Sequence, residues 1–175
     1  IYFDHKNIPM VLGVGRLTSQ KNFSLLIKSF AIVREKIEAK LVILGEGPLR
    51  EELKQLSKDL RIEKDVHLPG FVDNPFAWMR NSKVFVLSSN YEGLPNALIQ
   101  AMACGTQVIS TNCPTGPDEI LEGGKWGGLV DVGDLEGLSR EVLVALKKND
   151  FEDSVNRANY FSQDRAIELY EQLLF

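Results

Sequence analysis

Short apolar segments alternate along the chain with longer segments in which apolar residues recur every three or four positions. The segments Met10–Val14, Lys40–Leu44 and Lys83–Leu87 are short and largely apolar, as strands buried on both faces are. The segments 22–37 and 49–60 instead place their apolar residues on one helical face. This alternation predicts an α/β domain whose parallel sheet is covered by helices on both faces.

The same alternation continues to the end of the chain. In parallel sheets of this kind, ligands bind beyond the carboxyl ends of the strands. We therefore expect one Rossmann-like domain over residues 1–175, with a ligand crevice along that edge. Further strands are expected at 66–68, 107–110 and 128–130. Further helices are expected at 74–81, from Pro95 onward, at 117–121, and from an N-cap at Asp134 to about 146. Two more helices are expected between about 150 and 175, with a break near Ser162.

The stretch from Ser88 to Gly105 carries the most information about function. It contains a polar loop and then a helix expected to begin at Pro95, which suits the first helical position because the missing N–H costs nothing there. A helix start beside Gly93, with free N–H groups and the positive end of the dipole, is a candidate anion site. Glu92 lies at its mouth, where a carboxylate suits a ligand that carries hydroxyls as well as phosphate. This combination indicates a nucleotide-sugar.

Two cations lie in the loop after the first expected strand. Arg16 and Lys21 are candidates to hold a diphosphate, because Arg can form two bonds to it and Lys adds a point charge. The alternative is that both are solvated loop charges, and that Glu92 is only an acid that favours the helix dipole. The sequence contains no Asp-x-Asp, so we expect no metal and no cofactor besides the nucleotide-sugar itself.

At these residues the sequence resembles the C-terminal, donor-binding domain of the GT-B retaining glycosyltransferases, the group 1 or family four set. The resemblance spans nearly the whole chain, and its fragments are specific in their order and spacing rather than singly. They are Val14-Gly15-Arg16-Leu17 with Gln20-Lys21-Asn22, Leu44-Gly45-Glu46-Gly47-Pro48, Leu68-Pro69-Gly70-Phe71, and Glu92-Gly93-Leu94-Pro95-Asn96 with Ala101-Met102-Ala103-Cys104-Gly105.

The resemblance implies a role for each matching position. Arg16 and Lys21 match the pyrophosphate-binding pair, and Glu92 matches the acid that contacts hydroxyls of the transferred sugar; these three form the expected catalytic set. Thr115-Gly116-Pro117 and Glu119 are expected in a loop near the crevice, with a weaker claim. The expected donor-binding set is Gly15, Arg16, Lys21, the nucleobase segment Gly70, Phe71 and Val72, then Glu92, the backbone N–H groups of Gly93, Leu94 and Asn96, and finally Gln100.

One position departs from the family pattern. The family usually carries a second glutamate eight positions after the first, where it holds the ribose hydroxyls, and here that position is Gln100. Glutamine offers one acceptor oxygen and no charge, and charged acceptors beat neutral ones by about 1 kcal/mol. We expect ribose binding to survive but to be weakened several-fold.

The activity implied is retaining, metal-independent transfer of a hexose from a UDP-sugar to an acceptor hydroxyl in polysaccharide or glycolipid biosynthesis. An N-terminal acceptor-binding domain, absent from this chain, would complete the enzyme, so the chain alone is expected to transfer little. Membrane contact is expected only through that domain. The alternatives are a non-catalytic nucleotide-sugar-binding module and a nucleotide-sugar epimerase. A dinucleotide-dependent oxidoreductase fits less well, because Thr18 occupies the third glycine position after Gly13-Val14-Gly15.

Composition limits the classes of partner and the cellular location that we expect. A net charge of −4 without a basic stripe argues against nucleic acid as a partner. Strand-sized apolar runs, no signal peptide and two cysteines favour a cytoplasmic location, peripheral to the membrane at most in the full-length enzyme. The remaining side chains are assigned to structure: His67 to packing or a strand edge, Trp78 and Trp126 to packing, and Cys104 to a helix end rather than a nucleophile.

Overall fold

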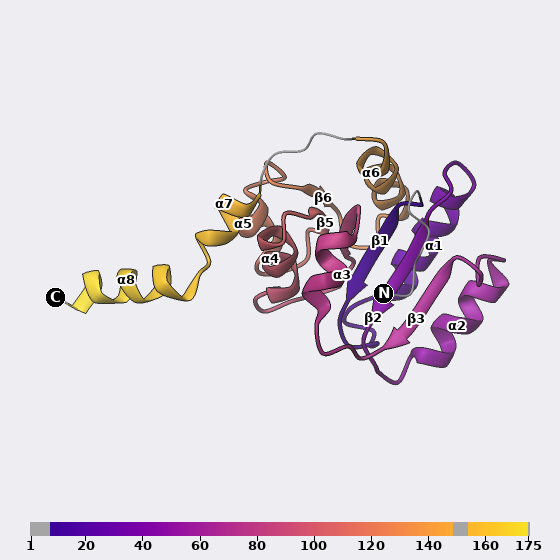
Figure 1. Ribbon diagram of the computed structural model, residues 1–175, viewed down its shortest axis with the longest axis horizontal. Helices are drawn as coiled ribbons and strands as arrows, with labels where there is room; N and C mark the ends of the chain where they lie inside the picture. Colours follow the sequence, from indigo (N-terminus) through magenta and orange to yellow (C-terminus); the bar gives the residue numbers. More distant parts are fainter. Residues whose placement is uncertain (1–7, 149–153, 175) are drawn as a thin grey trace.

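Within the described residues, 8–148 and 154–174, six parallel strands form one sheet in the computed structural model (Figure 1). The strand order is β3-β2-β1-β4-β5-β6, so β1 and β4 lie at the centre. This confirms the predicted Rossmann-like sheet. The strands are β1 (Met10–Val14), β2 (Lys40–Leu44), β3 (Val66–Gly70), β4 (Val84–Leu87), β5 (Gln107–Thr111) and β6 (Gly128–Val130).

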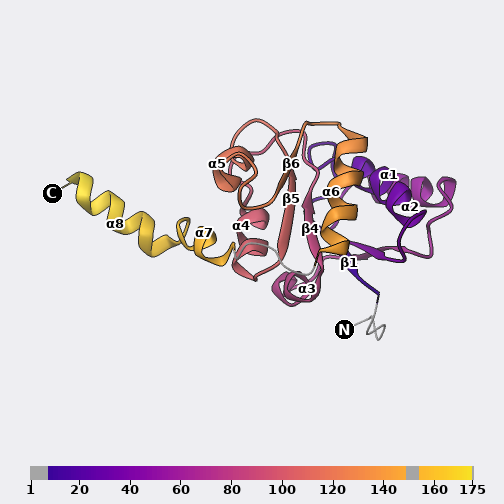
Figure 2. The ribbon, with the colours of Figure 1, turned by 90° about the horizontal axis from the view of Figure 1, so that it is seen from above.

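Helices cover both faces of the sheet (Figure 2). Val11 of β1 packs with the helices of one face and Leu12 with those of the other, and both side chains are fully buried. Burial on both faces is why the strands are apolar almost throughout. On one face lie α1 (Phe23–Arg34), α2 (Arg50–Asp59) and α6 (Leu135–Lys147); on the other lie α3 (Pro75–Asn81), α4 (Asn96–Ala103), α5 (Pro117–Leu121) and α7 (Val155–Asn159).

Some element boundaries differ from the prediction. α1 ends at Arg34 rather than Ile37, because the N–H groups of Lys36 and Ile37 both turn back to the carbonyl of Val33. β3 extends to Gly70 through Pro69, which an edge strand tolerates. Asp134 caps α6 as predicted, with its side chain accepting from the Gly137 N–H.

The start of α4 corrects a prediction that matters for the site. Pro95 is not the first helical residue: its ψ of 72° places it outside the helix, as the N-cap, and α4 begins at Asn96. The Asn96 N–H donates to the Leu94 carbonyl at 2.8 Å, which tightens the turn just before the helix.

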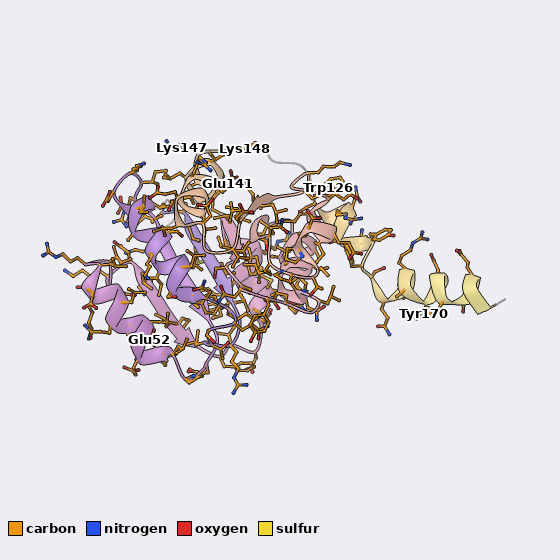
Figure 3. All side chains as sticks on the ribbon, turned by 180° about the vertical axis from the view of Figure 1, so that it is seen from behind. Glu52, Trp126, Glu141, Lys147, Lys148 and Tyr170 are labelled. Atoms are coloured by element: carbon orange, nitrogen blue, oxygen red, sulfur yellow. The ribbon has the colours of Figure 1, made fainter. Side chains whose placement is uncertain are left out.

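The C-terminal segment has the two predicted helices, broken at Ser162. α7 packs against α4 through buried Ala158, whereas α8 (Gln163–Leu174) extends away from the body (Figure 1). Tyr170 projects from α8 well clear of the sheet (Figure 3). Residues 150–153, where the prediction placed the start of this segment, lie outside the described residues.

Candidate active site

Two loops pack backbone against backbone at the carboxyl ends of β1 and β2. The Gly15 N–H donates to the Leu44 carbonyl at 2.9 Å, and the Leu17 N–H donates to the Glu46 carbonyl at 2.9 Å. Gly45 has a φ of 134°, and a side chain there would collide with the Gly15 carbonyl. Glycine at position 45 therefore lets the two loops come together at the edge of the sheet.

A cleft of about 440 Å³ opens beside these loops. Phe71 is 76% exposed and forms part of its apolar wall. Gly70 lies next to it, with its carbonyl accepting from the Gly45 N–H at 2.8 Å. Glu46, which the sequence placed in a family fragment but gave no role of its own, lines the cleft and pairs with Arg50 at 3.1 Å. The lining residues are Val14, Gly15, Arg16, Leu44, Gly45, Glu46, Phe71, Val72 and Pro75, so four of the expected donor-binding residues meet here.

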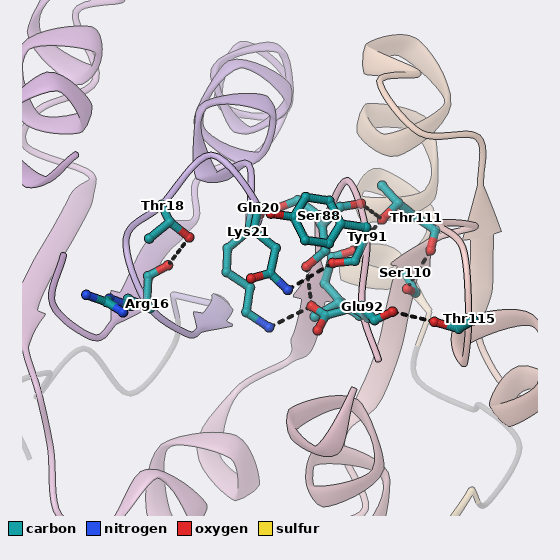
Figure 4. Close-up of polar contacts among 12 residues, drawn as sticks. Arg16, Thr18, Gln20, Lys21, Ser88, Tyr91, Glu92, Ser110, Thr111 and Thr115 are labelled. Atoms are coloured by element: carbon teal, nitrogen blue, oxygen red, sulfur yellow. Dashed lines mark hydrogen bonds and ion pairs between the residues drawn. The ribbon is translucent and has the colours of Figure 1, made fainter. Parts of the chain in front are cut away.

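An ion pair joins the loop after β1 to the loop after β4. The Lys21 Nζ lies 2.6 Å from Oε1 of Glu92 (Figure 4), and the two side chains are only 19% and 6% exposed. Ser89 Oγ donates to the same oxygen at 2.5 Å. Lys21 is therefore not a solvated loop charge, and the Glu92 carboxylate is held by two donors rather than by the helix dipole alone.

Amide side chains fasten the same two loops together. Asn22 Nδ2 donates to Asn90 Oδ1 at 3.0 Å, and Asn90 Nδ2 donates to the Ser19 carbonyl at 2.8 Å. Gln20 Nε2 donates to the Tyr91 carbonyl at 3.1 Å (Figure 4). Sequence reasoning missed these roles. The available signal was an Asn directly before one helix and another in the polar loop after a strand, positions where Asn often bonds to backbone.

The loop after β5 supports Glu92 from the other side. The Thr115 hydroxyl donates to the Glu92 carbonyl, and the Glu92 N–H donates to the Pro114 carbonyl at 3.3 Å (Figure 4). This places Thr115 beside the site, as expected. Glu119, which was assigned to a loop near the crevice, lies in α5, the helix that was also expected at 117–121, and its carbonyl accepts from Arg157 at 2.6 Å.

The turn before α4 leaves two backbone donors available. No acceptor is found within 8–148 and 154–174 for the N–H groups of Gly93 and Leu94, whereas that of Asn96 is already bonded to Leu94. A side chain at Gly93 would meet nothing within 4 Å, so open space adjoins this turn. Gln100 is exposed one turn into α4.

Arg16 differs from Lys21 in having no ionic partner. Its guanidinium is exposed and contacts no acidic side chain in the part of the chain that the structure describes. Its carbonyl accepts from the Thr18 N–H at 2.8 Å, and the Thr18 hydroxyl reaches the same oxygen at 3.5 Å (Figure 4). The charge is therefore free to meet a ligand in the cleft.

Neither thiol is prepared for nucleophilic chemistry. Burial raises the pKa of Cys113, and the neighbouring charge of Glu92 raises it further. Burial likewise raises the pKa of Cys104. Both thiols stay protonated at neutral pH, and only the thiolate is a strong nucleophile.

The other residues assigned to structure also lie as expected. Burial lowers the pKa of His67, which lies in the edge strand β3, so it stays neutral at pH 7. Trp78 and Trp126 pack against the core on the face that α3 and α4 cover. Among the described residues, no group of three or more His, Cys, Asp or Glu side chains is arranged to hold a metal ion. In the same residues, no helix has the length and apolar character needed to cross a membrane.

Comparison with known proteins identifies relatives over most of the chain. The lipopolysaccharide core biosynthesis glycosyltransferase LpsE of Rhizobium meliloti (strain 1021) is 31% identical over 172 residues, covering 95% of this chain and 49% of the relative. The N-acetylgalactosamine-N,N'-diacetylbacillosaminyl-diphospho-undecaprenol 4-alpha-N-acetylgalactosaminyltransferase of Campylobacter jejuni is 43% identical over 122 residues, covering 70% of this chain and 33% of the relative. The chain thus spans less than half the length of these relatives.

Solved structures share the fold. The apo form of the lipopolysaccharide outer core galactosyltransferase WaaB matches 98% of this chain and 50% of its own, with a TM-score of 0.86 and 24% identity. Anabaena Alr3699/HepE in complex with UDP and glucose matches 95% of this chain and 48% of its own, with a TM-score of 0.86 and 20% identity. The family model for glycosyl transferases group 1 matches residues 3–163. The chain therefore belongs to the glycosyl transferases group 1 family, as its motifs predicted, and its sheet is a Rossmann-like domain of the GT-B fold.

Proposed function

We propose that this chain is the donor-binding domain of a retaining glycosyltransferase that uses a UDP-sugar without a metal ion. The observation that carries the proposal is the Lys21–Glu92 pair, fixed at the carboxyl edge of the sheet beside an apolar cleft. A cation suits the diphosphate of such a donor, a carboxylate suits the hydroxyls of its sugar, and an apolar wall suits its base.

The ligand would lie across the edge of the sheet. Phe71 and Val72 form an apolar wall for the base. The Arg16 guanidinium, which has no ionic partner in the described residues, would grip the diphosphate, and the free N–H groups of Gly93 and Leu94 would bind its oxygens. Glu92 would accept hydrogen bonds from hydroxyls of the sugar.

This arrangement supplies the charge stabilisation that sugar transfer needs. Negative charge grows on the leaving diphosphate as the glycosidic bond breaks, and cations and backbone donors placed beside it would stabilise it more in the transition state than in the bound donor. Arg16, Lys21 and the turn before α4 would take that part in place of a metal ion. The sugar would pass to an acceptor hydroxyl with its anomeric configuration retained.

The relatives support the choice of donor. Their names include a galactosaminyltransferase and lipopolysaccharide core enzymes, and the matched structures of Anabaena HepE and of S. aureus TarM contain UDP. We therefore propose that the enzyme transfers a hexose from a UDP-sugar. The transfer would serve polysaccharide or glycolipid assembly at the cytoplasmic side of the membrane.

A second domain would bind the acceptor. The chain spans about half the length of WaaB and HepE. Phe71, Tyr91 and Leu94 are each more than half exposed around the crevice, which suits a face that another domain closes over. We propose that an N-terminal acceptor-binding domain lies there and carries any membrane contact, so the isolated chain binds donor weakly and transfers little.

Calorimetric titration tests the donor site. We expect UDP to bind, UDP-sugars to differ from one another, and EDTA to have no effect. Arg16→Ala should weaken UDP binding by about tenfold or more, because a charge-assisted bond to phosphate contributes roughly 1.5–3 kcal/mol. Arg165→Ala is the matched control, since Arg165 is an exposed arginine on α8. Binding of NAD in place of UDP, or equal affinities for the two variants, would contradict the proposal.

A further inference from the structure

We infer that Ser89 is a positioning residue that orients Glu92 for the sugar of the donor. The inference rests on the proposed function, because it assigns Glu92 to a sugar hydroxyl. Ser89 is the second residue after the end of β4, and it is fully buried, with an exposed fraction of 0%. Neither composition nor motif spacing distinguishes it from its neighbour, and only its contacts do.

Ser89 is held at both its backbone and its side chain. Its carbonyl accepts from the Thr111 hydroxyl at 2.6 Å, which ties it to the end of β5. Its own hydroxyl donates to Oε1 of Glu92 at 2.5 Å. Because the serine is anchored from the neighbouring strand, its hydroxyl is a fixed point against which the carboxylate can be oriented.

The two donors to Glu92 share one oxygen. Lys21 and Ser89 both reach Oε1, and no hydrogen bond joins Oε2 to another residue within 8–148 and 154–174. Oε2 is therefore the oxygen left to accept from a ligand hydroxyl. An ionised carboxylate has about four lone-pair sites, two on each oxygen, so Oε2 can accept hydrogen bonds while Oε1 is occupied.

Lys21 and Ser89 differ in what a ligand does to them. In the ligand-free protein the Lys21 ammonium lies on Glu92, yet the proposed function also assigns it to the diphosphate. Lysine is a flexible point charge that can turn toward a new anion. When it does so, Ser89 remains as the donor that no ligand displaces. The serine hydroxyl would then be what keeps Oε2 aimed at the sugar in the loaded site.

Comparing UDP with a UDP-sugar isolates this role. For Ser89→Ala we expect UDP to bind within about twofold of wild type, and the chosen UDP-sugar to lose about tenfold relative to UDP, because a hydrogen bond to a charged group is lost. Ser89→Thr, which keeps a hydroxyl, should restore most of the ratio. Ser57→Ala is the control, since Ser57 is also buried and its hydroxyl donates only to the Leu53 carbonyl in α2.

The outcomes separate the inference from the proposed function. A correctly folded Ser89→Ala variant with an unchanged ratio of UDP-sugar to UDP affinity would overturn the role of Ser89 while leaving the donor site in place. An equal loss for both ligands would reduce Ser89 to a packing residue. If wild type bound no nucleotide, the proposed function would fail, and the inference would fail with it because Glu92 would have no donor sugar to contact.

Discussion

Glu92 and Lys21 lie 71 positions apart in the sequence, yet their side chains meet at 2.6 Å. Each was singled out from its local context, a charge beside a glycine or in a loop after a strand. Their pairing could not be predicted in that way, because it depends on β1 and β4 being neighbours in the sheet. The same holds for Asn22 and Asn90, whose bond joins the same two loops.

Gln100 provides a prediction at the scale of one side chain. Gln100→Glu should strengthen UDP binding several-fold, because a charged acceptor for the ribose hydroxyls exceeds a neutral one by about 1 kcal/mol. Position 100 is exposed on α4, so the change should not disturb packing. Calorimetry with UDP measures the effect, and Glu171→Gln on exposed α8 serves as a charge control. Unchanged affinity would mean that α4 does not reach the ribose.

At the scale of elements, one carboxylate joins the end of α1 to the starts of β2 and β3. Asp65 accepts from Arg34 Nε at 2.9 Å and from Lys40 Nζ at 2.7 Å. Burial raises the pKa of Asp65, but the hydrogen bonds from Lys40 and Arg34 outweigh burial, and the pKa lies below its ordinary value. The three side chains are each only about a fifth exposed, so solvent screens these bonds partly.

This clamp predicts a pH-dependent contribution to stability. A carboxyl whose pKa is lowered on folding stabilises the protein above its unfolded pKa, about 3.9, and this is lost as pH falls through the folded value. Asp65→Asn should therefore lower the free energy of unfolding by about 1–2 kcal/mol at pH 7. Urea unfolding should show the difference from wild type shrinking below about pH 4. Asp59→Asn is the control, because Asp59 is exposed. If the difference in free energy of unfolding between Asp65→Asn and wild type did not depend on pH, the clamp would be refuted.

The elements themselves were largely predictable, and the exceptions have local causes. Strand and helix positions follow from apolar periodicity because both faces of the sheet are buried. Pro95 was placed inside α4 because proline suits the first helical position, but the turn closed by Asn96 and Leu94 holds it one residue outside. The helix predicted at 117–121 is confirmed as α5, so Glu119 lies in that helix and not in the loop that holds Thr115.

At the scale of the whole molecule, α8 contributes little to the folded body. Its described side chains are exposed, and Ile167 and Tyr170 face solvent. Removing residues 163–175 should therefore change the thermal midpoint by no more than about 2 °C, within the range expected for groups outside a core. Differential scanning calorimetry measures this.

A longer truncation is the matched comparison. Ending the chain before Ser154 also removes α7, whose Ala158 is buried against α4 and whose Arg157 donates to the carbonyls of Glu119 and Ile120. That variant should lose stability clearly. A large loss already on removing α8 would show that α8 packs on the body in solution.

Because β1 lies at the centre of the sheet, its two neighbouring strands are synthesised at different times. β2 follows within a single crossover, but the partner on the other side, β4, begins only at Val84. At about 5–20 residues per second, the nascent chain carries an open edge on its central strand for roughly 4–14 s. Such an edge can pair with other chains. Slower translation before β4 would lengthen that exposure, so we expect slowly translated codons over residues 45–83 to lower the soluble yield.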